Sequence, residues 1–129
     1  TVFYVDLDGF KSINDQFGHA AGDAVLMAVG SRLSQMVRPQ DAVARLGGDE
    51  FVVVSVARDA PVMAERIQAA IIEPLTWGDH SLEIGASVGV ATGQNRSTTF
   101  LLAQADAALY EAKNHGRNTI HRSALAHAR

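Results

Sequence analysis

Residues 45–51 read RLGGDEF and are followed by three valines at 52–54. The Gly-Gly pair separates two apolar segments. Because glycine reaches positive φ angles without steric cost, the pattern predicts a two-residue hairpin turn. Asp49 and Glu50 come directly after the turn. Carboxylates beside a backbone without side chains suit metal-bound phosphate chemistry, although acids at a turn tip are more often simply solvated.

Periodicity predicts the elements on either side of this hairpin. Apolar residues at three- and four-residue spacings indicate helices, and alternation of apolar with other residues indicates strands. In chain order we expect a strand over 2–6, a polar loop to 22, a helix capped by Asp23 and ended by Pro39, hairpin strands over 42–46 and 51–57, a helix from Asp59 to Pro74, a strand over 81–91, a helix from 97–99 to Gly116, and a short strand over 118–122. This order favours a single α+β domain with a ferredoxin-like (βαββαβ) core, in which helices pack on a mostly antiparallel sheet.

Length and composition exclude several classes of protein. The 129 residues fit one domain, 1–129, and the net charge of -3 argues against broad nucleic-acid binding, which needs a basic face. The chain has no cysteine, which excludes disulfides and is compatible with a reducing compartment. Its longest apolar run is far shorter than the roughly 20 residues of a membrane-spanning helix, and no signal-peptide pattern is visible. We expect a cytoplasmic domain, either free or as the cytoplasmic part of a membrane-anchored protein.

A second acidic pair, Asp6 and Asp8, ends the first predicted strand. In a ferredoxin-like core this strand lies beside the central hairpin, so Asp6 and Asp49 can converge on one cation. Mg²⁺ prefers oxygen ligands and usually binds through one or two carboxylates plus substrate phosphates. Two such ions can stabilise both the attacking and the leaving oxygen of a displacement. Solvation or turn capping is the alternative for either pair taken alone.

Two further polar sets have both a local and a functional interpretation. Asn14 and Asp23, with His19 between them, precede the first predicted helix; an amide and a carboxylate can read guanine, but a turn and a helix cap explain them equally well. Lys113 and Arg117 straddle the end of the third predicted helix. They suit a phosphate clamp, in which arginine binds bidentately, or they offset the helix dipole.

Ordered motifs over nearly the whole chain resemble those of the GGDEF-domain diguanylate cyclases. They are DLDGFK at 6–11, ND at 14–15, FGH at 17–19, GD at 22–23, GGDEF at 47–51, and AD, LY, AK and GRN between 105 and 118. The resemblance implies a fold like that of nucleotidyl cyclases and polymerase palm domains. It also implies condensation of two GTP into cyclic di-GMP with release of two pyrophosphates. Each domain would bind one GTP, so catalysis would need a homodimer.

The resemblance also implies a role for each matching position. Asp6, Asp49 and the carbonyl of Leu7 would bind Mg²⁺, as two ions per site, with Mn²⁺ as a substitute. Asp49 and Glu50 would be catalytic, Glu50 by assisting deprotonation of the 3′-hydroxyl or by supporting the metal site. The substrate-binding positions would be Asn14 and Asp23 for guanine, the backbone of Gly9, Phe10 and Lys11 together with Lys113 and Arg117 for the β- and γ-phosphates, and Gly48 for the ribose and α-phosphate.

Arg38 and Asp41 form an Arg-x-x-Asp motif with five residues between it and Gly47. It resembles the inhibitory product site of the family, to which Arg66 on the second predicted helix would add a further arginine. The alternative is a helix C-terminal arginine followed by an acid at the start of a strand.

Other functions and partners stay open at this point. Family members carry an upstream segment with a Leu-Thr-Gly-Leu stretch, and the present chain begins at the first strand. We expect loss of that segment to uncover apolar sheet surface and remove part of the pocket wall. The alternatives to a cyclase are a non-catalytic module that senses GTP or cyclic di-GMP and a dimerisation element alone. Sensory or phosphodiesterase domains are expected partners in a longer parent protein.

Overall fold

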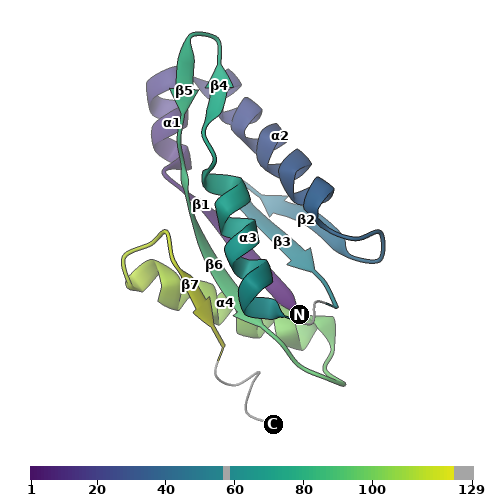
Figure 1. Ribbon diagram of the computed structural model, residues 1–129. Coiled ribbons are helices and arrows are strands. Elements are labelled where there is room, and N and C mark those ends of the chain that lie inside the picture. Colours follow the sequence, from purple (N-terminus) through teal and green to yellow (C-terminus); the bar gives the residue numbers. More distant parts are fainter. Residues whose placement is uncertain (57–58, 124–129) are drawn as a thin grey trace.

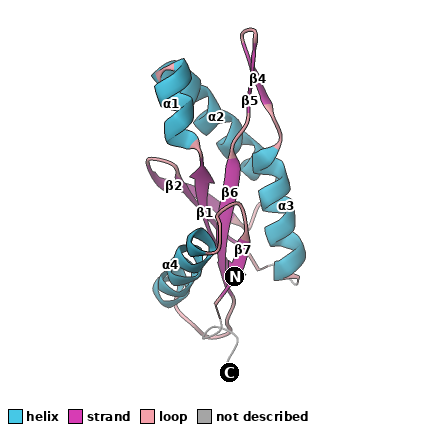
Figure 2. Cartoon of the chain, turned by 90° about the vertical axis from the view of Figure 1, so that its left-hand side faces the viewer, coloured by secondary structure: helices cyan, strands magenta, loops and turns pink. Residues whose placement is uncertain are grey.

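The computed structural model describes residues 1–56 and 59–123 (Figure 1). Its elements, in chain order, are β1 (Val2–Asp8), α1 (Phe10–Phe17), α2 (His19–Met36), β2 (Ala42–Gly47), β3 (Glu50–Val54), α3 (Ala60–Ile72), β4 (Leu75–Trp77), β5 (His80–Leu82), β6 (Gly85–Ala91), α4 (Thr98–Asn114) and β7 (Ile120–Arg122). The predicted α+β arrangement is confirmed. A five-stranded sheet has α4 on one side and α3 on the other, and β4 and β5 form a separate hairpin (Figure 2).

The strand β1 lies at the centre of the sheet. The order is β2-β3-β1-β6-β7; β1 is antiparallel to both β3 and β6, and β7 runs parallel to β6 at the edge. The first four of these strands have the ferredoxin-like arrangement that the sequence predicts. In this register Asp6 lies opposite Glu50 of β3 and Ser87 of β6. The end of β1 therefore lies beside the β2–β3 hairpin.

The side chains of β1 alternate between two cores. Phe3 and Leu7 are buried in the main core, which fills the space between the sheet and helices α2 and α3. Val2 belongs to a smaller core that includes Leu101 of α4. Because strand side chains have a period of two, Asp6 lies on the same side as Val2. The acidic end of β1 thus faces α4.

Helix α4 lies directly on β6 because Gly89 has no side chain. A Cβ atom at this position would lie 2.1 Å from the carbonyl oxygen of Ala105 and 2.3 Å from the amide nitrogen of Leu109. The alternation of small residues between 81 and 91 predicts such an approach by a helix or a neighbouring backbone, and the prediction is confirmed. The contact brings the last turns of α4 over the central strands.

Three helix-end signals are confirmed. The side chain of Asp59 accepts a hydrogen bond from the amide of Val62 and caps α3. Ser97 caps α4 by accepting from the amide of Phe100 at 3.0 Å. Gly116, just after α4, has a φ of 102° and thus the left-handed backbone expected of a residue that ends a helix. No helix in the described ranges is long and apolar enough to span a membrane.

The segment before the first predicted helix differs from the prediction. Instead of a polar loop to residue 22, it contains α1 and the first turn of α2, which begins at His19. Asp23 therefore lies inside α2 and does not cap it, and α2 ends at Met36, before Pro39. Helix α1 has an apolar stripe, since Ile13 is buried and Phe10 and Phe17 are partly buried against the main core, but it is only eight residues long and its other residues are polar, as in a loop. Gly18, with a φ of 95°, separates the two helices.

The predicted strand over 81–91 is also interrupted. It divides into β5 and β6, and β5 pairs with β4, a segment just after Pro74 for which the sequence predicts no strand. Helix α3 ends earlier, at Ile72, because the residue before Pro74 is disfavoured in helical conformation. The strand predicted over 51–57 ends at Val54, and its last residue, Ala57, lies outside the described residues.

Candidate functional site

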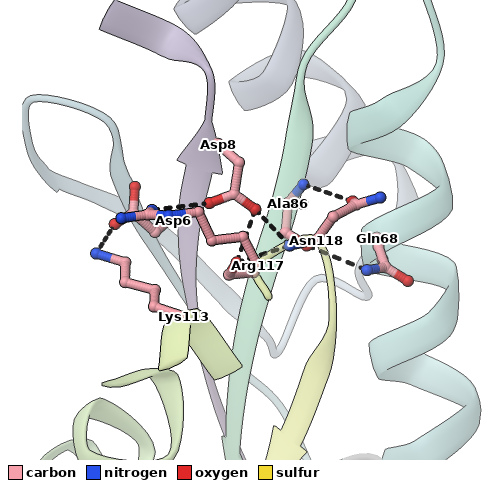
Figure 3. Close-up of polar contacts among 8 residues, drawn as sticks. Asp6, Asp8, Gln68, Ala86, Lys113, Arg117 and Asn118 are labelled. Carbon is pink, nitrogen blue, oxygen red and sulfur yellow. Dashed lines mark hydrogen bonds and ion pairs between the residues drawn. The ribbon is translucent and has the colours of Figure 1, made fainter. Parts of the chain in front are cut away.

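Asp6 is the buried carboxylate at the centre of the site. Only 6% of the residue is exposed, and its Oδ2 forms an ion pair with Nζ of Lys113 on α4 (Figure 3). Burial raises the pKa of Asp6; the hydrogen bond and charge of Lys113 oppose this rise, and the neighbouring carboxylate of Asp49 adds to it. The structure therefore brings together three of the predicted site residues, from β1, α4 and the hairpin.

The β2–β3 hairpin is anchored to β1 beside Asp6. The amide of Leu7 donates to the carbonyl oxygen of Asp49 at 3.0 Å, and Nε of Arg45 donates to the carbonyl of Gly48 at 3.0 Å. Gly47 and Gly48 have φ angles of 139° and 50°, which glycine adopts readily. The predicted hairpin is confirmed, but its two-residue turn lies one position later, at Gly48 and Asp49, because Gly47 is the last residue of β2 and pairs with Glu50. The contacts of this tip fix the position of Asp49.

A hydrogen bond orients the side chain of Glu50. The hydroxyl of Tyr4 donates to its Oε1 at 3.1 Å. Burial raises the pKa of Tyr4 to about 12, and the hydrogen bond to Glu50 and that carboxylate's charge contribute to the rise. Tyr4 thus stays protonated near neutral pH and remains a donor that orients Glu50.

The donor set at this point fits Mg²⁺. The carboxylate of Asp49 lies close enough to disfavour ionisation of Asp6, an effect that a divalent cation would relieve. Among the described residues, no group of three or more acidic, histidine or cysteine side chains could form a cage around a metal. Mg²⁺ is commonly bound by only one or two carboxylates, and substrate phosphates complete its coordination.

The N-terminus of α1 follows β1 after a single residue. Gly9 has a φ of 85°, and in the described structure no side chain caps the amides that begin this helix at Phe10 and Lys11. Exposed amides at a helix N-terminus attract anions such as phosphate. The side chain of Lys11 points to solvent, 93% exposed, and pairs with Asp15 at 3.8 Å. The backbone of this turn, and not the lysine side chain, faces the end of the central strand.

Asn14 and Asp23 are placed near each other by the packing of α1 on α2. The Oδ1 of Asn14 lies 1.8 Å from the position that a Cβ of Gly22 would take, so a side chain at residue 22 would displace Asn14. Asp23 is the next residue and is exposed. His19, between them in sequence, begins α2 and is exposed. The structure thus gives the predicted guanine-reading pair a common location on the α1–α2 junction.

Lys113 and Arg117 also converge on the end of β1. Lys113 pairs with Asp6 as described above, and Nη1 of Arg117 lies 3.5 Å from Oδ1 of Asp8 (Figure 3). The local interpretation of these cations as partners of the helix dipole is therefore incomplete, because both contact β1. The side chain of Arg117 is 60% exposed, which leaves most of its donors accessible.

A separate recess brings together Arg38, Asp41 and Arg66. Its volume is about 350 Å³, and it lies between the end of α2, the start of β2 and α3. The Arg38 amide donates to Oδ2 of Asp41 at 3.0 Å and lowers the pKa of that carboxyl. The other oxygen, Oδ1, is buried without a hydrogen-bond partner in the described part of the chain. The spacing within Arg-x-x-Asp thus forms a turn that opens onto the arginine of α3.

Sequence reasoning missed several residues that organise the site. Ser87 and Asn118 both contact the carboxylate of Asp8, and Tyr4 orients Glu50. The spacing of Asp6 and Asp8 could have indicated that Asp8 lies on the same face of the strand as Asp6, because residues two apart in a strand share a face. Ser87 carried no such signal, since only the register of β6 against β1 places it there.

Comparison with known proteins assigns the family. Residues 1–119 match the family described as diguanylate cyclase, GGDEF domain. A bifunctional diguanylate cyclase/cyclic di-GMP phosphodiesterase from Pseudomonas aeruginosa, MucR, is 45% identical over 122 residues, which are 91% of this chain and 18% of MucR. The probable diguanylate cyclase DgcF of Escherichia coli K12 is 38% identical over 92% of this chain and 41% of its own length. The chain thus spans less than half the length of these relatives.

Solved structures agree in fold. A sensory box/GGDEF protein from Caulobacter crescentus is 42% identical, with a TM-score of 0.82 over 89% of this chain and 78% of that one. The GGDEF domain of DgcB from the same organism, solved in complex with c-di-GMP, has a TM-score of 0.82 at 30% identity, over 95% of this chain and 76% of that one. The family match covers β1 to α4 and the turn of Arg117 and Asn118. The chain therefore belongs to the GGDEF-domain family of diguanylate cyclases.

Proposed function

We propose that this domain is a diguanylate cyclase, which condenses two GTP molecules into cyclic di-GMP and releases two pyrophosphates. The observation that carries the proposal is the convergence of Asp6, Asp49 and Lys113 at the end of the central strand. Two carboxylates and a cation at one point suit a triphosphate bound with Mg²⁺. The names of the relatives MucR, DgcF and DgcP support the same activity.

The proposed substrate site extends from this point along α1. The guanine base would bind Asn14 and Asp23 at the junction of α1 and α2. The β- and γ-phosphates would lie at the uncapped N-terminus of α1, over the backbone of residues 9–11, where helix amides favour anions. Lys113 and Arg117 would neutralise the phosphates from α4, and Gly48 would leave room for the ribose and α-phosphate.

The proposed chemistry is two identical displacements. The 3′-oxygen of one GTP attacks the α-phosphorus of the other, and the bond to the bridging oxygen breaks, which releases pyrophosphate. The hydroxyl proton goes to a base, for which Glu50, oriented by Tyr4, is the side chain at hand. Asp6, Asp49 and the Leu7 carbonyl would hold Mg²⁺, which would neutralise triphosphate charge. Because each domain holds one GTP, two copies must face each other as a homodimer, and catalysis rests on positioning and charge.

The recess of Arg38, Asp41 and Arg66 would bind the product and inhibit the reaction. A guanidinium can pair with phosphate or with a guanine edge, and the carboxylate of Asp41 lines the same recess. A domain that consumes GTP is expected in the cytoplasm. Attached sensory or phosphodiesterase domains would control it in a longer parent, as the bifunctional name of MucR suggests.

The decisive experiment incubates the full chain at high concentration with GTP and Mg²⁺ and identifies products by mass spectrometry. We expect cyclic di-GMP from the wild type and a loss on the order of 10²-fold or more in Asp49→Ala, because that carboxylate acts on developing charge. Glu83→Ala, which removes an exposed carboxylate between β5 and β6, is the matched control and should retain activity.

Two other outcomes would change the assignment. Absence of product together with a rise in melting temperature on addition of GTP would indicate a module that senses the nucleotide without converting it. Absence of both product and GTP binding would leave dimerisation as the function. Near-normal turnover by Asp49→Ala would remove that residue from the metal site.

A further inference from the structure

The carboxylate of Asp8 joins β1, β6 and the turn that follows α4. Its Oδ2 accepts from the hydroxyl of Ser87 at 2.7 Å and from the amide of Asn118 at 2.7 Å, and its Oδ1 lies 3.5 Å from Nη1 of Arg117 (Figure 3). The side chain is 11% exposed, and Ser87 is fully buried. These contacts link the end of the central strand to a segment more than a hundred residues later.

The turn held by Asp8 has an unusual backbone. Arg117 and Asn118 have φ angles of 61° and 46°, the left-handed region that residues with a side chain seldom adopt. Such conformations persist where surrounding contacts determine them. Here the amide of Arg117 donates to the carbonyl of Ala112 at 3.2 Å, and the amide of Asn118 donates to Asp8. Asp8 thus supplies a charged acceptor for one of the two left-handed residues.

The side chain of Asn118 fixes the same turn from the other side. Its Oδ1 accepts from the amide of Ala86 at 3.0 Å, and the carbonyl of Ala86 accepts from Nε2 of Gln68 at 3.1 Å (Figure 3). The amide of Asn118 also lies 3.1 Å from the Ser87 hydroxyl oxygen. The turn is therefore attached to β6 as well as to β1, and Arg117 leaves it at a defined position.

We infer that Asp8, with Ser87 and Asn118, is a positioning residue that fixes the Arg117 turn for binding of the β- and γ-phosphates of GTP. This rests on the proposed function, which gives Arg117 that role. The alternative, Asp8 as a metal ligand, fits the contacts less well. Its carboxylate is engaged by the turn, whereas that of Asp6 pairs with Lys113 (Figure 3). Arg117 makes only a long contact to Asp8, so its guanidinium keeps donors for phosphate.

The test compares two nucleotides that differ in the phosphates Arg117 would contact. GTP and GMP affinities are measured by calorimetry for the wild type, Asp8→Asn, Ser87→Ala and the control Asp79→Asn, an exposed acid in the β4–β5 turn. We expect Asp8→Asn to weaken GTP binding about 10-fold and GMP binding less than about 2-fold, with a smaller GTP-selective loss in Ser87→Ala. Ser87→Ala also serves if Asp8→Asn fails to fold.

A double-mutant cycle with Arg117→Ala separates positioning from a general loss of structure. If Asp8 acts through Arg117, Asp8→Asn should change GTP affinity less than about 2-fold in the Arg117→Ala background. A full and additive loss in that background, or an equal loss of GTP and GMP, would overturn the inference. Hydrogen exchange gives an independent readout, since the Asn118 amide should exchange at least about 10-fold faster in Asp8→Asn.

These readouts distinguish failure of the inference from failure of the proposed function. A chain that makes no cyclic di-GMP but shows the GTP-selective loss and the faster Asn118 exchange supports the positioning role and contradicts the cyclase activity. A chain that makes cyclic di-GMP while Asp8→Asn leaves Asn118 exchange and GTP affinity unchanged overturns the positioning role alone. A wild-type chain that binds neither nucleotide overturns both.

Discussion

Lys113, near the end of α4, forms an ion pair with the buried carboxylate of Asp6 in the central strand. The lysine side chain is 28% exposed and the aspartate side chain 8%, so water reaches the cation better than the anion. Lys113 thereby compensates a carboxylate that burial and the neighbouring Asp49 would otherwise disfavour. In the proposed reaction the same two residues bind the metal and the phosphates, and a charged substrate complex would replace their mutual contact.

The first prediction is that Asp6→Asn raises the melting temperature while it abolishes turnover. The pKa of Asp6 is raised in the folded state, so ionisation of this group lowers the free energy of unfolding as pH rises through the folded pKa. A neutral amide removes that cost near neutral pH, whereas Lys113→Met should lower the melting temperature because it leaves the buried carboxylate unpaired. Thermal unfolding of the two variants at pH 7 tests this; a lower melting temperature for Asp6→Asn would contradict it.

Gly89→Ala should destabilise the domain through its contact with α4. The added methyl would overlap backbone atoms of Ala105 and Leu109, which cannot rotate away, so the helix must shift. Overpacking of this kind typically costs about 1–3 kcal/mol. Urea unfolding measures the change. Gly30→Ala in α2 is the matched control, since its Cβ would meet the Phe51 ring at 3.8 Å; this ordinary contact should allow a gain of up to about 1 kcal/mol.

The strongly periodic parts of the fold were predictable from the sequence. Val25, Val29 and Leu33 form one buried stripe of α2, as their spacing indicates. The Gly-Gly pair marks the hairpin as predicted, although the turn itself is Gly48-Asp49. The β4–β5 hairpin was not predictable, because three-residue strands are too short to show alternation. Helix α1 escaped prediction because it is only eight residues long and its stripe of Phe10, Ile13 and Phe17 lies among polar residues that are common in loops.

The site residues were predictable where a sequence motif fixes their position, and less predictable where tertiary packing fixes it. Asp6 and Asp49 converge because the ferredoxin-like order places β1 beside the hairpin, which the sequence indicates. The contact of Asp8 with Asn118 depends on the parallel pairing of β7 with β6 and on two left-handed residues. Neither the strand pairing nor the left-handed backbone can be predicted from a local pattern, because residue spacing does not show which distant segments pack against β1.

The stability of the Arg38–Asp41 turn should depend on pH. The amide of Arg38 lowers the pKa of Asp41 below its usual 3.8, so the carboxylate contributes stability above that value and loses it as pH falls through the lowered pKa. Asp41→Asn should therefore be less stable than the wild type at pH 7, with the difference shrinking below pH 3.8. Urea unfolding of both proteins at pH 7 and in acid checks this. A difference that stays constant would contradict the prediction.

His80 should anchor α1 through the β4–β5 hairpin. Its ring lies 4.9 Å from that of Phe17 at the end of α1 and 6.3 Å from that of Trp77, between centroids. His80→Ala should cost about 0.5–1.5 kcal/mol, toward the low end because His80 is exposed, and α1 amides should exchange faster. Hydrogen exchange of residues 10–17 measures this. His80→Phe keeps an aromatic ring and should restore protection, whereas unchanged exchange in His80→Ala would show that the hairpin does not hold α1.

Arg38→Ala should relieve product inhibition without reducing the initial rate. Arg38 lines the recess with Asp41 and Arg66 and is not among the residues that contact Asp6 or Asp8 in the described structure. A charge-assisted contact to phosphate or guanine contributes roughly 1.5–3 kcal/mol, so the half-inhibitory concentration of cyclic di-GMP should rise by about 10-fold or more. Initial rates at increasing cyclic di-GMP measure the shift. Arg96→Ala, which removes an arginine stacked over Phe100 at 4.8 Å, should leave inhibition unchanged. If Arg38→Ala were inhibited as strongly as the wild type, the recess would not be the product site.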